Sequence, residues 1–318
     1  MKKALIVGHT GQDGTYLYQY LDTLNYNIIG ISSKTYRTNF ASISSTIEIT
    51  NKKEVADLLL YFQPDEIYFF AAIHQSSTDF NNDDYHLFQE SSQINVIALI
   101  NFLEGINNYS KKSKLFYAAS SHVFGNPSTL IQNERTPLNP NCIYGITKTT
   151  GMHLCHFYNS NHNIYASVGV FYNHESPLRS SKFVSKKIVE SAVAIKYKKL
   201  NKLFLGNLKA RIDWGYAPDY VNAAHRILQL DTPDVFVISS GYTHTVGDFV
   251  EGVFDYLKLD WKQYVEEDPN LIKKISKNNL QGDYSKLHSA TNWSPQVNFS
   301  GLIEIMVNSE IEKYNNEQ

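Results

Sequence analysis

The sequence predicts an α/β protein in which a parallel, doubly wound sheet is followed by a smaller mixed α/β lobe. Short apolar runs alternate with amphipathic helical patterns through the first half of the chain, which is typical of parallel strands joined by helical crossovers. A glycine-rich turn directly follows the first apolar run, and beyond Phe171 the alternation loosens. With 318 residues, 42% of them hydrophobic, the chain is long enough to bury a large core.

The first half of the chain predicts a regular alternation of strand and helix. We expect strands at residues 3–8, 27–32, 46–50, 66–72, 114–120 and 164–171. Helices are expected from the glycine turn to about residue 24 and at 52–62, 85–109 and 144–158. Right-handed crossovers between parallel strands then fix most of the topology.

The second half predicts fewer strands and longer amphipathic helices. Helices are expected at 183–199, 218–230, 246–259 and 299–314, with strands at 203–205 and 235–240. We therefore divide the chain into a first domain of residues 1–171, joined by about 213–240, and a second lobe of about 172–212 and 241–318.

Composition excludes several classes of function. The net charge of −2 gives no electrostatic footprint for nucleic acid or an anionic membrane. No apolar run approaches the ~18 residues of a membrane span, and the N-terminus is interpreted as the first strand of a cytoplasmic protein, not as a signal peptide. Cys142 and Cys155 are too few for a disulfide framework, and no Cys/His cluster has zinc spacing. We expect both cysteines to be packing residues and expect no metal site.

The turn after the first strand has the context of a dinucleotide-binding fingerprint. Three glycines at a spacing of three lie between the strand and the next helix, where tight turns let the backbone approach a pyrophosphate at the helix N-terminus. An ordinary strand–helix turn is the alternative. We assign the turn to a cofactor site made by Gly8, Gly11, Gln12, Asp13 and Gly14.

The end of the second strand bears on the choice of cofactor. NAD binding calls for an acidic residue there to hold the ribose 2′-hydroxyl. This chain has Ser33 and Lys34, with Arg37 nearby and no Asp or Glu. Hydroxyls and cations suit a 2′-phosphate, so NADP is favoured over NAD, and exposed loop residues without a ligand are the alternative.

Tyr144 and Lys148 form the candidate acid–base pair. Their spacing of four puts both side chains on one face of a helix. A phenol has a pKa near ~10, and a neighbouring ammonium favours the phenolate, which makes Tyr144 a candidate general acid/base. The alternative is ordinary helix surface, because this spacing arises often in a chain with 22 tyrosines.

Several of these motifs together resemble the extended short-chain dehydrogenase/reductase family of nucleotide-sugar epimerases and dehydratases. The glycine turn, Tyr144 and Lys148 carry that likeness, with Ala71-Ala72 and Asn95-Val96. The second half is most similar to GDP-mannose 4,6-dehydratases, through residues 171–179, 182–187, 205–207, 213–220 and 292–295.

The resemblance implies a Rossmann-type NAD(P)-binding domain (1–171 and about 213–240) and a lobe that binds a nucleotide sugar. In that family the residue matching Tyr144 takes the proton of the sugar C4 hydroxyl while hydride moves from C4 to the nicotinamide. The residue matching Lys148 holds the nicotinamide ribose and lowers the tyrosine pKa. Ser120, after the fifth expected strand, corresponds to the hydroxyl that binds the C4 oxygen; a packing serine is the alternative.

The remaining site residues are assigned on the same basis. To the cofactor site we add Glu48, Ala71 and Ala72. To the substrate site we assign Ser121, Asn173, Arg179, Val184, Lys187 and Arg211. For the lysines and arginines the alternative is a solvated surface side chain. The implied partner is a GDP-linked sugar.

The chain departs from the dehydratase pattern where that family has its catalytic glutamate. His122 occupies that position; neutral imidazole can act as a base, but the carboxylate is missing. In addition, Ile212 replaces an arginine that contacts pyrophosphate, with Arg211 one position earlier. A short segment between the second and third strands leaves a homodimer or a homotetramer open.

These features favour NAD(P)-dependent hydride chemistry at C4 of a GDP-linked manno-type hexose or heptose: dehydrogenation, ketone reduction or epimerisation. The resemblance places such chemistry in the biosynthesis of surface glycans such as capsule or lipopolysaccharide. One alternative is a GDP-mannose-type 4,6-dehydratase with His122 as the base. Another is a cofactor-binding regulator without catalytic activity.

Overall fold

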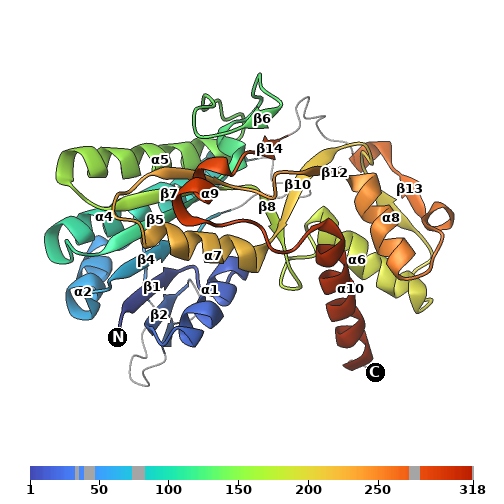
Figure 1. Cartoon of the computed structure of the whole chain (residues 1–318), viewed down its shortest axis with the longest axis horizontal. Coiled ribbons are helices and arrows are strands. Elements are labelled where there is room, and N and C mark those ends of the chain that lie inside the picture. The colour runs from blue at the N-terminus through green and yellow to red at the C-terminus, as the bar shows by residue number, and fades with distance from the viewer. Residues whose placement is uncertain (33–35, 39–46, 74–82, 272–279, 317–318) are drawn as a thin grey trace.

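A seven-stranded sheet forms the centre of the larger part of the molecule (Figure 1). The computed structural model describes residues 1–32, 36–38, 47–73, 83–271 and 280–316. The strand order is β11-β7-β5-β4-β1-β2-β3. Six of these strands are parallel: β1 (Lys3–Val7), β2 (Asn27–Ile31), β4 (Glu66–Phe69), β5 (Lys114–Ser120), β7 (Ala166–Phe171) and β11 (Val235–Ile238). The predicted α/β fold with a doubly wound parallel sheet is confirmed.

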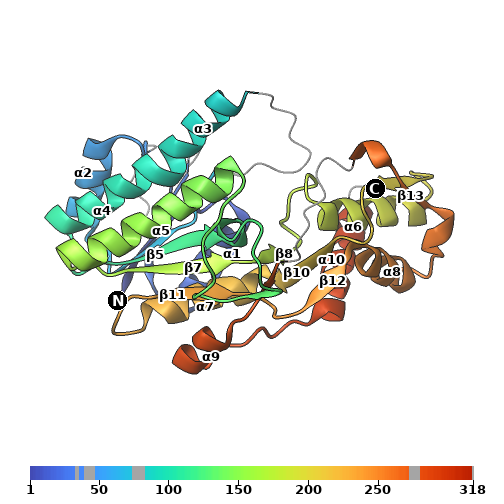
Figure 2. The same ribbon diagram turned by 90° about the horizontal axis from the view of Figure 1, so that it is seen from above.

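Helices cover both faces of this sheet. On one face lie α2 (Lys52–Phe62), α4 (Ala98–Tyr109) and α5 (Ile143–His162), and on the other α1 (Gln12–Thr23) and α7 (Ala217–Leu228), as Figure 2 shows from above. Because both faces are covered, the inner strands are apolar along their whole length and do not alternate. All six residues of β7 are buried.

A smaller group of elements lies to one side of the sheet, at the right of Figure 1. Its three-stranded sheet consists of β8 (Asn173–Glu175), β10 (Arg211–Tyr216) and β12 (Thr243–Thr245). The helices α6 (Val184–Lys196), α8 (Val246–Tyr256) and α10 (Phe299–Asn316) pack with them, beside the pair β9 (Leu203–Leu205) and β13 (Val265–Glu267). Short connecting elements are β6 (Ile131–Gln132), β14 (Gln281–Gly282) and α9 (Ser285–Thr291).

Two separate hydrophobic clusters match the two parts. The first contains the strands of the seven-stranded sheet and the inner faces of its helices. The second contains the inner faces of α6, α8 and α10 with Trp214. Leu287 and Trp293 belong to the first cluster although they follow residue 241. The domain boundaries stay a prediction: the clusters agree with a division into two parts, but Trp214 belongs to the second cluster although it falls within the segment 213–240. No helix in the described ranges is both long enough and apolar enough to cross a membrane.

Two expected elements differ in the structure. The expected strand at 46–50 is wrong for its described residues, because 47–48 have no regular structure and 49–50 form a turn. The Glu48 side chain accepts hydrogen bonds from the amide and hydroxyl of Thr50. The edge strand is instead β3 (Tyr36–Thr38), antiparallel to β2. The expected helix at 85–109 is α3 (Asp84–Ser92) and α4 joined by a π-helical turn at Gln93–Ile97.

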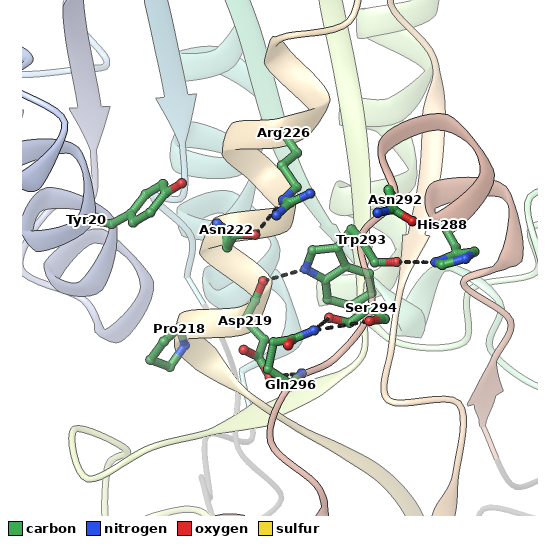
Figure 3. Close-up of a pocket in the computed structure, with 10 residues that line it drawn as sticks. All are labelled: Tyr20, Pro218, Asp219, Asn222, Arg226, His288, Asn292, Trp293, Ser294 and Gln296. Carbon is green, nitrogen blue, oxygen red and sulfur yellow. Dashed lines mark hydrogen bonds between the residues drawn. The ribbon is translucent and has the colours of Figure 1, made fainter.

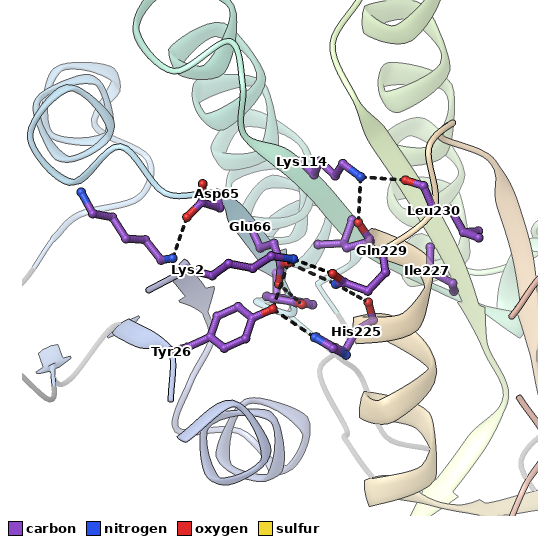
Figure 4. A network of polar contacts seen from close by, with 12 residues as sticks. Lys2, Tyr26, Asp65, Glu66, Lys114, His225, Ile227, Gln229 and Leu230 are labelled. Carbon is purple, nitrogen blue, oxygen red and sulfur yellow. Dashed lines mark hydrogen bonds and ion pairs between the residues drawn. The ribbon is translucent and has the colours of Figure 1, made fainter. Parts of the chain in front are cut away.

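A buried polar network closes the sheet at the amino ends of its strands (Figure 4). The Glu66 side chain, 2% exposed, accepts hydrogen bonds from Tyr68 at 2.7 Å, Lys2 at 3.0 Å, Tyr26 at 3.1 Å and Gln229 at 3.1 Å. Burial works to raise the pKa of Glu66, but these donors outweigh it and lower that pKa. The network joins β1, β2 and β4 to the end of α7, on the edge opposite the glycine turn.

Replacing Glu66 with Ala is expected to destabilise the fold by about 3 kcal/mol, because it leaves buried donors without an acceptor. Tyr26→Phe removes one donor and is expected to cost about 1 kcal/mol. Denaturant unfolding of both variants measures the two values. Equal losses, or no loss for Glu66→Ala, would contradict the role given to this carboxylate.

Candidate active site

The predicted site residues come from loops at the carboxyl ends of neighbouring parallel strands. The glycine turn follows β1, Ala71 follows β4, Ser120 ends β5 and Asn173 lies just beyond β7. Carboxyl ends of parallel strands meet at one edge of a sheet, which is where open α/β folds bind ligands. The sheet order therefore brings together residues that are distant in sequence.

The glycine turn is closed so tightly that side chains would not fit at two positions. A Cβ atom at Gly14 would lie 2.3 Å from the Gly8 carbonyl oxygen, and one at Gly8, whose φ is +94°, would lie 2.8 Å from the Ala71 amide nitrogen. Gly11 is the N-cap of α1 and contributes no side-chain cap. A helix N-terminus without such a cap presents amide N–H groups and the positive end of the helix dipole, which suits a pyrophosphate. The turn fits a dinucleotide.

The loop after β4 is held against the helix that carries Tyr144. The Asn95 side chain accepts a hydrogen bond from the Ile73 amide at 3.0 Å and donates one to Thr147 Oγ1 at 2.9 Å. Asn95 is fully buried. Ala71 and Ala72 thus lie in a loop fixed between the glycine turn and α5.

Gln12 and Asp13 contact the smaller lobe. His174 Nε2 lies 2.9 Å from Asp13 Oδ1, and His174 Nδ1 lies 2.7 Å from the Tyr172 carbonyl oxygen. Gln12 donates to the His174 carbonyl at 3.0 Å and accepts from Ser176 Oγ at 2.7 Å. These contacts join strand β8 to the first turn of α1. The sequence predicted only a cofactor-binding role for Gln12 and Asp13 and did not predict this link.

Electrostatics make the Asp13–His174 contact an ion pair. For Asp13, burial raises the pKa, but the charge and hydrogen bond of His174 outweigh it, so the pKa is lowered. Burial also works to lower the pKa of His174, and Asp13 outweighs it, so that pKa is raised. Both shifts favour the charged forms, a protonated imidazole and an ionised carboxylate.

Tyr144, Ser120 and Lys148 lie together beside the end of β5. A hydrogen bond with Ser120 acts on the Tyr144 hydroxyl. Lys148 Nζ, 5.7 Å from the centre of the Tyr144 ring, donates a hydrogen bond to the Ala118 carbonyl at 2.7 Å. The lysine side chain is 1% exposed. Three of the four predicted catalytic residues are thus brought together; the fourth is His122.

The expected lowering of the tyrosine pKa by Lys148 is not what the structure gives. Burial raises the pKa of Tyr144, and the Asp13 charge adds to that rise, against smaller effects of Arg179 and Ser120. Burial also lowers the pKa of Lys148 to about 7. Desolvation therefore acts on both groups, raising the pKa of the phenol and lowering the pKa of the ammonium beside it.

His122 lies on the other side of Tyr144. The two rings meet edge to face with their centres 5.8 Å apart, and Cys142 Sγ lies 3.7 Å from His122 Nδ1. Part of the His122 residue is exposed to water. Protein atoms nevertheless surround much of its ring, and the resulting desolvation lowers the pKa of the imidazole. Ser121, which precedes it, is buried.

The predicted substrate residues fall into two groups. Arg179 Nε forms an ion pair with the buried Glu175 at 3.0 Å, and its guanidinium stacks 3.5 Å from the centre of the Phe183 ring. Asn173 lies in β8 and Val184 begins α6, both half-buried. Lys187 donates a hydrogen bond to the Phe204 carbonyl at 2.8 Å. The Arg211 guanidinium donates hydrogen bonds to the hydroxyl of Thr243 at 3.0 Å and to the carbonyl of Thr243 at 2.7 Å. Lys187 and Arg211 are thus held by the smaller lobe.

Some predicted cofactor residues cannot be placed at the site. Ser33 and Lys34 lie outside the described residues, and Arg37 belongs to β3, of whose side chains the structure says nothing. Glu48 is exposed and engaged within its own turn.

Sequence reasoning missed His174 and Cys142 as members of the site. His174 belongs to the Asn-His-Glu-Ser-Pro run, whose unusual density of polar groups after a buried strand was the available signal. Nothing in the local sequence of Cys142 indicates its contact with His122, because the two residues are 20 positions apart.

A separate hollow of about 610 Å³ contains none of the predicted site residues (Figure 3). It lies between α1, α7 and the chain after α9. Asp219 there accepts hydrogen bonds from the amides of Gln296 and Val297, and Arg226 donates to the Thr291 carbonyl. Its polar side chains are engaged in joining these segments, so it is not the candidate active site.

The Asp13–His174 pair predicts a pH-dependent contribution to stability. Because folding raises the pKa of His174, the stabilisation that it contributes is fully present below its pKa in the unfolded chain, ~6.5. That stabilisation is lost as the pH rises through the higher pKa of His174 in the folded protein. Because folding lowers the pKa of Asp13, the stabilisation that it contributes is fully present above its pKa in the unfolded chain, ~3.9. That stabilisation is lost as the pH falls through the lower pKa of Asp13 in the folded protein. His174→Gln is expected to cost about 3 kcal/mol near pH 5.5 and less at pH 8.5.

Thermal unfolding of the wild type and His174→Gln across this range measures that difference. The exposed His156→Gln on α5 is the matched control and should show no such trend. A cost for His174→Gln that is constant with pH would contradict the ion pair.

Comparisons with known proteins identify the family of the chain. The family model for GDP-mannose 4,6 dehydratase matches residues 5–306. GDP-mannose 4,6 dehydratase 2 of Arabidopsis thaliana is 33% identical, over 98% of this chain and 87% of that protein.

Solved structures share the fold at low sequence identity. RMD from Pseudomonas aeruginosa complexed with NADPH has a TM-score of 0.83 at 18% identity, covering 98% of this chain and 100% of that one. The dTDP-glucose 4,6-dehydratase of Bacillus anthracis in complex with NAD has a TM-score of 0.82 at 21% identity, covering 99% and 98%. With the family match over nearly its whole length, the chain belongs to the GDP-mannose 4,6-dehydratase family of short-chain dehydrogenase/reductase enzymes.

Proposed function

We propose that this protein carries out NAD(P)-dependent hydride chemistry at C4 of a GDP-linked manno-type hexose or heptose. The observation that carries the proposal is the group of Ser120, Tyr144 and Lys148 beside a glycine turn that fits a dinucleotide. Dehydrogenation, ketone reduction and C4 epimerisation all use this group, because each moves a proton on the C4 oxygen and a hydride on C4.

Tyr144 is the proposed acid/base at the C4 oxygen. Its phenolate accepts the proton of the C4 hydroxyl during oxidation, the resulting phenol returns that proton during reduction, and Ser120 holds the same oxygen. Burial raises the pKa of Tyr144, so the phenolate that serves as the base is the minor form of the side chain at neutral pH. The bound nicotinamide supplies the acceptor or donor of the hydride.

Lys148 is a proposed cofactor-binding residue. Its ammonium is buried, and its pKa is lowered to about 7, so polar partners that stabilise the charge increase its protonated fraction. Ribose hydroxyls are such partners. Gly8, Gly11 and Gly14 with the first turn of α1 would hold the pyrophosphate, and Ala71 and Ala72 would line the cofactor.

A GDP-linked substrate is proposed from family membership and from the cations near β8. Arg179 is half-buried and oriented by Glu175 and Phe183, which suits a diphosphate oxygen. Asn173, Ser121, Val184, Lys187 and Arg211 complete the proposed substrate set. The relatives named for GDP-mannose support this nucleotide, and a cytoplasmic role in surface-glycan synthesis, as a homodimer or homotetramer, follows as part of the proposal.

A second candidate function is 4,6-dehydration with His122 in place of the glutamate. The observation that favours it is the position of His122 against Tyr144 in a chain otherwise similar to dehydratases. Incubation with GDP-mannose or GDP-manno-heptose separates the two: a product lighter by one water supports dehydration, whereas reduced cofactor without loss of water supports C4 oxidation.

Tyr144→Phe is expected to lower the rate of C4 oxidation about 10³-fold, because it removes the acid/base. Cofactor affinity, measured by titration of nicotinamide fluorescence, should stay within a few-fold of wild type. The exposed Tyr61→Phe on α2 serves as the matched control. A variant that keeps full activity would contradict the role of Tyr144, and a wild-type protein inactive on every GDP-sugar would favour a cofactor-binding regulator.

NADPH is expected to bind more tightly than NADH. Lys34→Glu should weaken NADPH about tenfold by removing a charge-assisted contact to the 2′-phosphate, and should leave NADH unchanged. Parallel titrations measure both affinities. Lys53→Glu, the same charge change at an exposed position of α2, is the control, and tighter binding of NADH would contradict the preference.

A further inference from the structure

The hollow between α1, α7 and the chain after α9 has the dimensions of a ligand site of its own (Figure 3). Its volume of about 610 Å³ lies within the range of roughly 300–1,000 Å³ that is typical of small-molecule sites. It contains none of the residues assigned to the candidate active site. The hydrogen bonds that join its walls use only part of each polar side chain, so donors and acceptors are left for a ligand.

Trp293 fixes the shape of the hollow. Its ring is buried, and its indole N–H donates a hydrogen bond to the Asp219 carbonyl at 3.0 Å. His288 Nδ1 lies 2.9 Å from the Trp293 carbonyl. A carbonyl only accepts, so Nδ1 carries the proton and Nε2 is left as an acceptor in the neutral ring. These bonds attach the chain after α9 to the first turn of α7, which makes the hollow a preformed site.

Arg226 is the cation of the hollow. Its Nε donates a hydrogen bond to Asn222 Oδ1, four residues earlier on α7, at 2.8 Å, and its Nη1 donates one to the Thr291 carbonyl at 3.0 Å. A guanidinium has more N–H donors than these bonds use, and the residue is exposed. The remaining N–H groups of Nη1 and Nη2 have no hydrogen-bond partner among the described residues. An oriented guanidinium with free N–H groups suits a phosphate oxygen.

Asp219, the acidic side chain of the lining, opposes an anion only in part. Its Oδ2 atom already accepts hydrogen bonds from the Gln296 and Val297 amides at 2.9 and 3.0 Å, and these N–H dipoles offset part of its negative charge. Burial also raises the pKa of this carboxyl. The hollow therefore keeps the positive character of Arg226.

Neutral polar groups and an aromatic ring line the rest of the hollow. Asn222 uses its Oδ1 atom for Arg226, which leaves its side-chain NH₂ group as a donor. Asn292, exposed at the end of α9, adds a second amide. Tyr20 projects from α1 toward α7 and adds a ring and a hydroxyl (Figure 3). Donors and acceptors beside an aromatic face suit a compound that carries several hydroxyl groups, such as a sugar.

We propose that this hollow is a second ligand site, which binds a sugar phosphate with the phosphate on Arg226 and the sugar hydroxyls on the surrounding amides. Inorganic phosphate would pair with the arginine but leave most of the hollow unfilled. A neutral sugar would leave the guanidinium without an anion. The site does not depend on the hydride chemistry proposed above. A ligand there contacts both α7 and the chain after α9, so it stabilises the folded protein.

Ligand-observed NMR titrations of the full-length protein with mannose 1-phosphate, inorganic phosphate and mannose test the proposal. Mannose 1-phosphate is expected to bind with a dissociation constant of about 1 mM. Inorganic phosphate should bind about tenfold more weakly because it lacks the sugar contacts, and mannose should bind about tenfold more weakly because it lacks the charge. Inorganic phosphate that binds as tightly as mannose 1-phosphate would overturn the proposal, because the hollow would then hold an adventitious ion only.

Variants of the lining locate the bound ligand. Arg226→Gln should weaken mannose 1-phosphate about tenfold, because it removes the charge-assisted contact. Asn292→Asp should weaken it several-fold by placing a negative charge in the hollow. Aspartate also adopts the left-handed conformation of this position, where φ is 53°, so the fold should be kept. Arg135→Gln, the same charge change at an exposed residue outside the hollow, is the matched control and should bind as the wild type does.

Thermal unfolding separates this site from the candidate cofactor site. About 10 mM mannose 1-phosphate should raise the Tm of the wild type and of Arg135→Gln by about 2 °C and should leave that of Arg226→Gln unchanged. NADPH should raise the Tm of all three proteins alike, because the glycine turn lies apart from the hollow. Unchanged binding of mannose 1-phosphate in Arg226→Gln, or loss of both ligands together in that variant, would overturn the proposal.

Discussion

Asp13 and His174 lie 161 positions apart in the sequence and 2.9 Å apart in the fold. Their contact joins the glycine turn, which carries the candidate cofactor site, to β8, which begins the candidate substrate site. Both groups are largely removed from water, and their pKa shifts run in opposite directions toward the charged forms. A buried charge without its partner would be costly, so each half of the site constrains where the other half lies.

This constraint reaches the catalytic group through charge as well as position. Asp13 is ionised near Tyr144 and raises the pKa of the phenol, while Arg179, held by Glu175, lowers it. The acidity of Tyr144 is thus set by two charges anchored to β8 and by burial. Lys148, one turn along α5, donates a hydrogen bond to the Ala118 carbonyl. The two side chains proposed for proton transfer and for cofactor binding therefore have different surroundings.

Sequence patterns predicted the parts that follow from local chemistry. Apolar runs identified the parallel strands, because strands covered on both faces are apolar throughout, and Gly8 and Gly14 were identifiable because no side chain fits there. The edge strand β3 and the polar strands β8, β10 and β12 have no such signature. The Asp13–His174 and Cys142–His122 contacts depend on how distant segments pack, which no local pattern encodes. The same limit explains the tyrosine: spacing put Lys148 beside Tyr144, but only the fold shows that burial governs both pKa values.

His122 is the residue at which the site departs from the family pattern, since Ser120, Tyr144 and Lys148 around it all match that pattern. A carboxylate at that position would be ionised and would only accept hydrogen bonds at neutral pH, whereas a neutral imidazole has one donor and one acceptor nitrogen. Cys142, the N-cap of the helix that also carries Tyr144 and Lys148, is a polar neighbour of this imidazole, with its Sγ atom 3.7 Å from His122 Nδ1. One helix thus carries Tyr144, the proposed acid/base, and is capped by the residue that contacts His122. Because Tyr144 belongs to this helix and Cys142 caps it, the packing of α5 on the turn after β5 fixes where both side chains lie relative to His122.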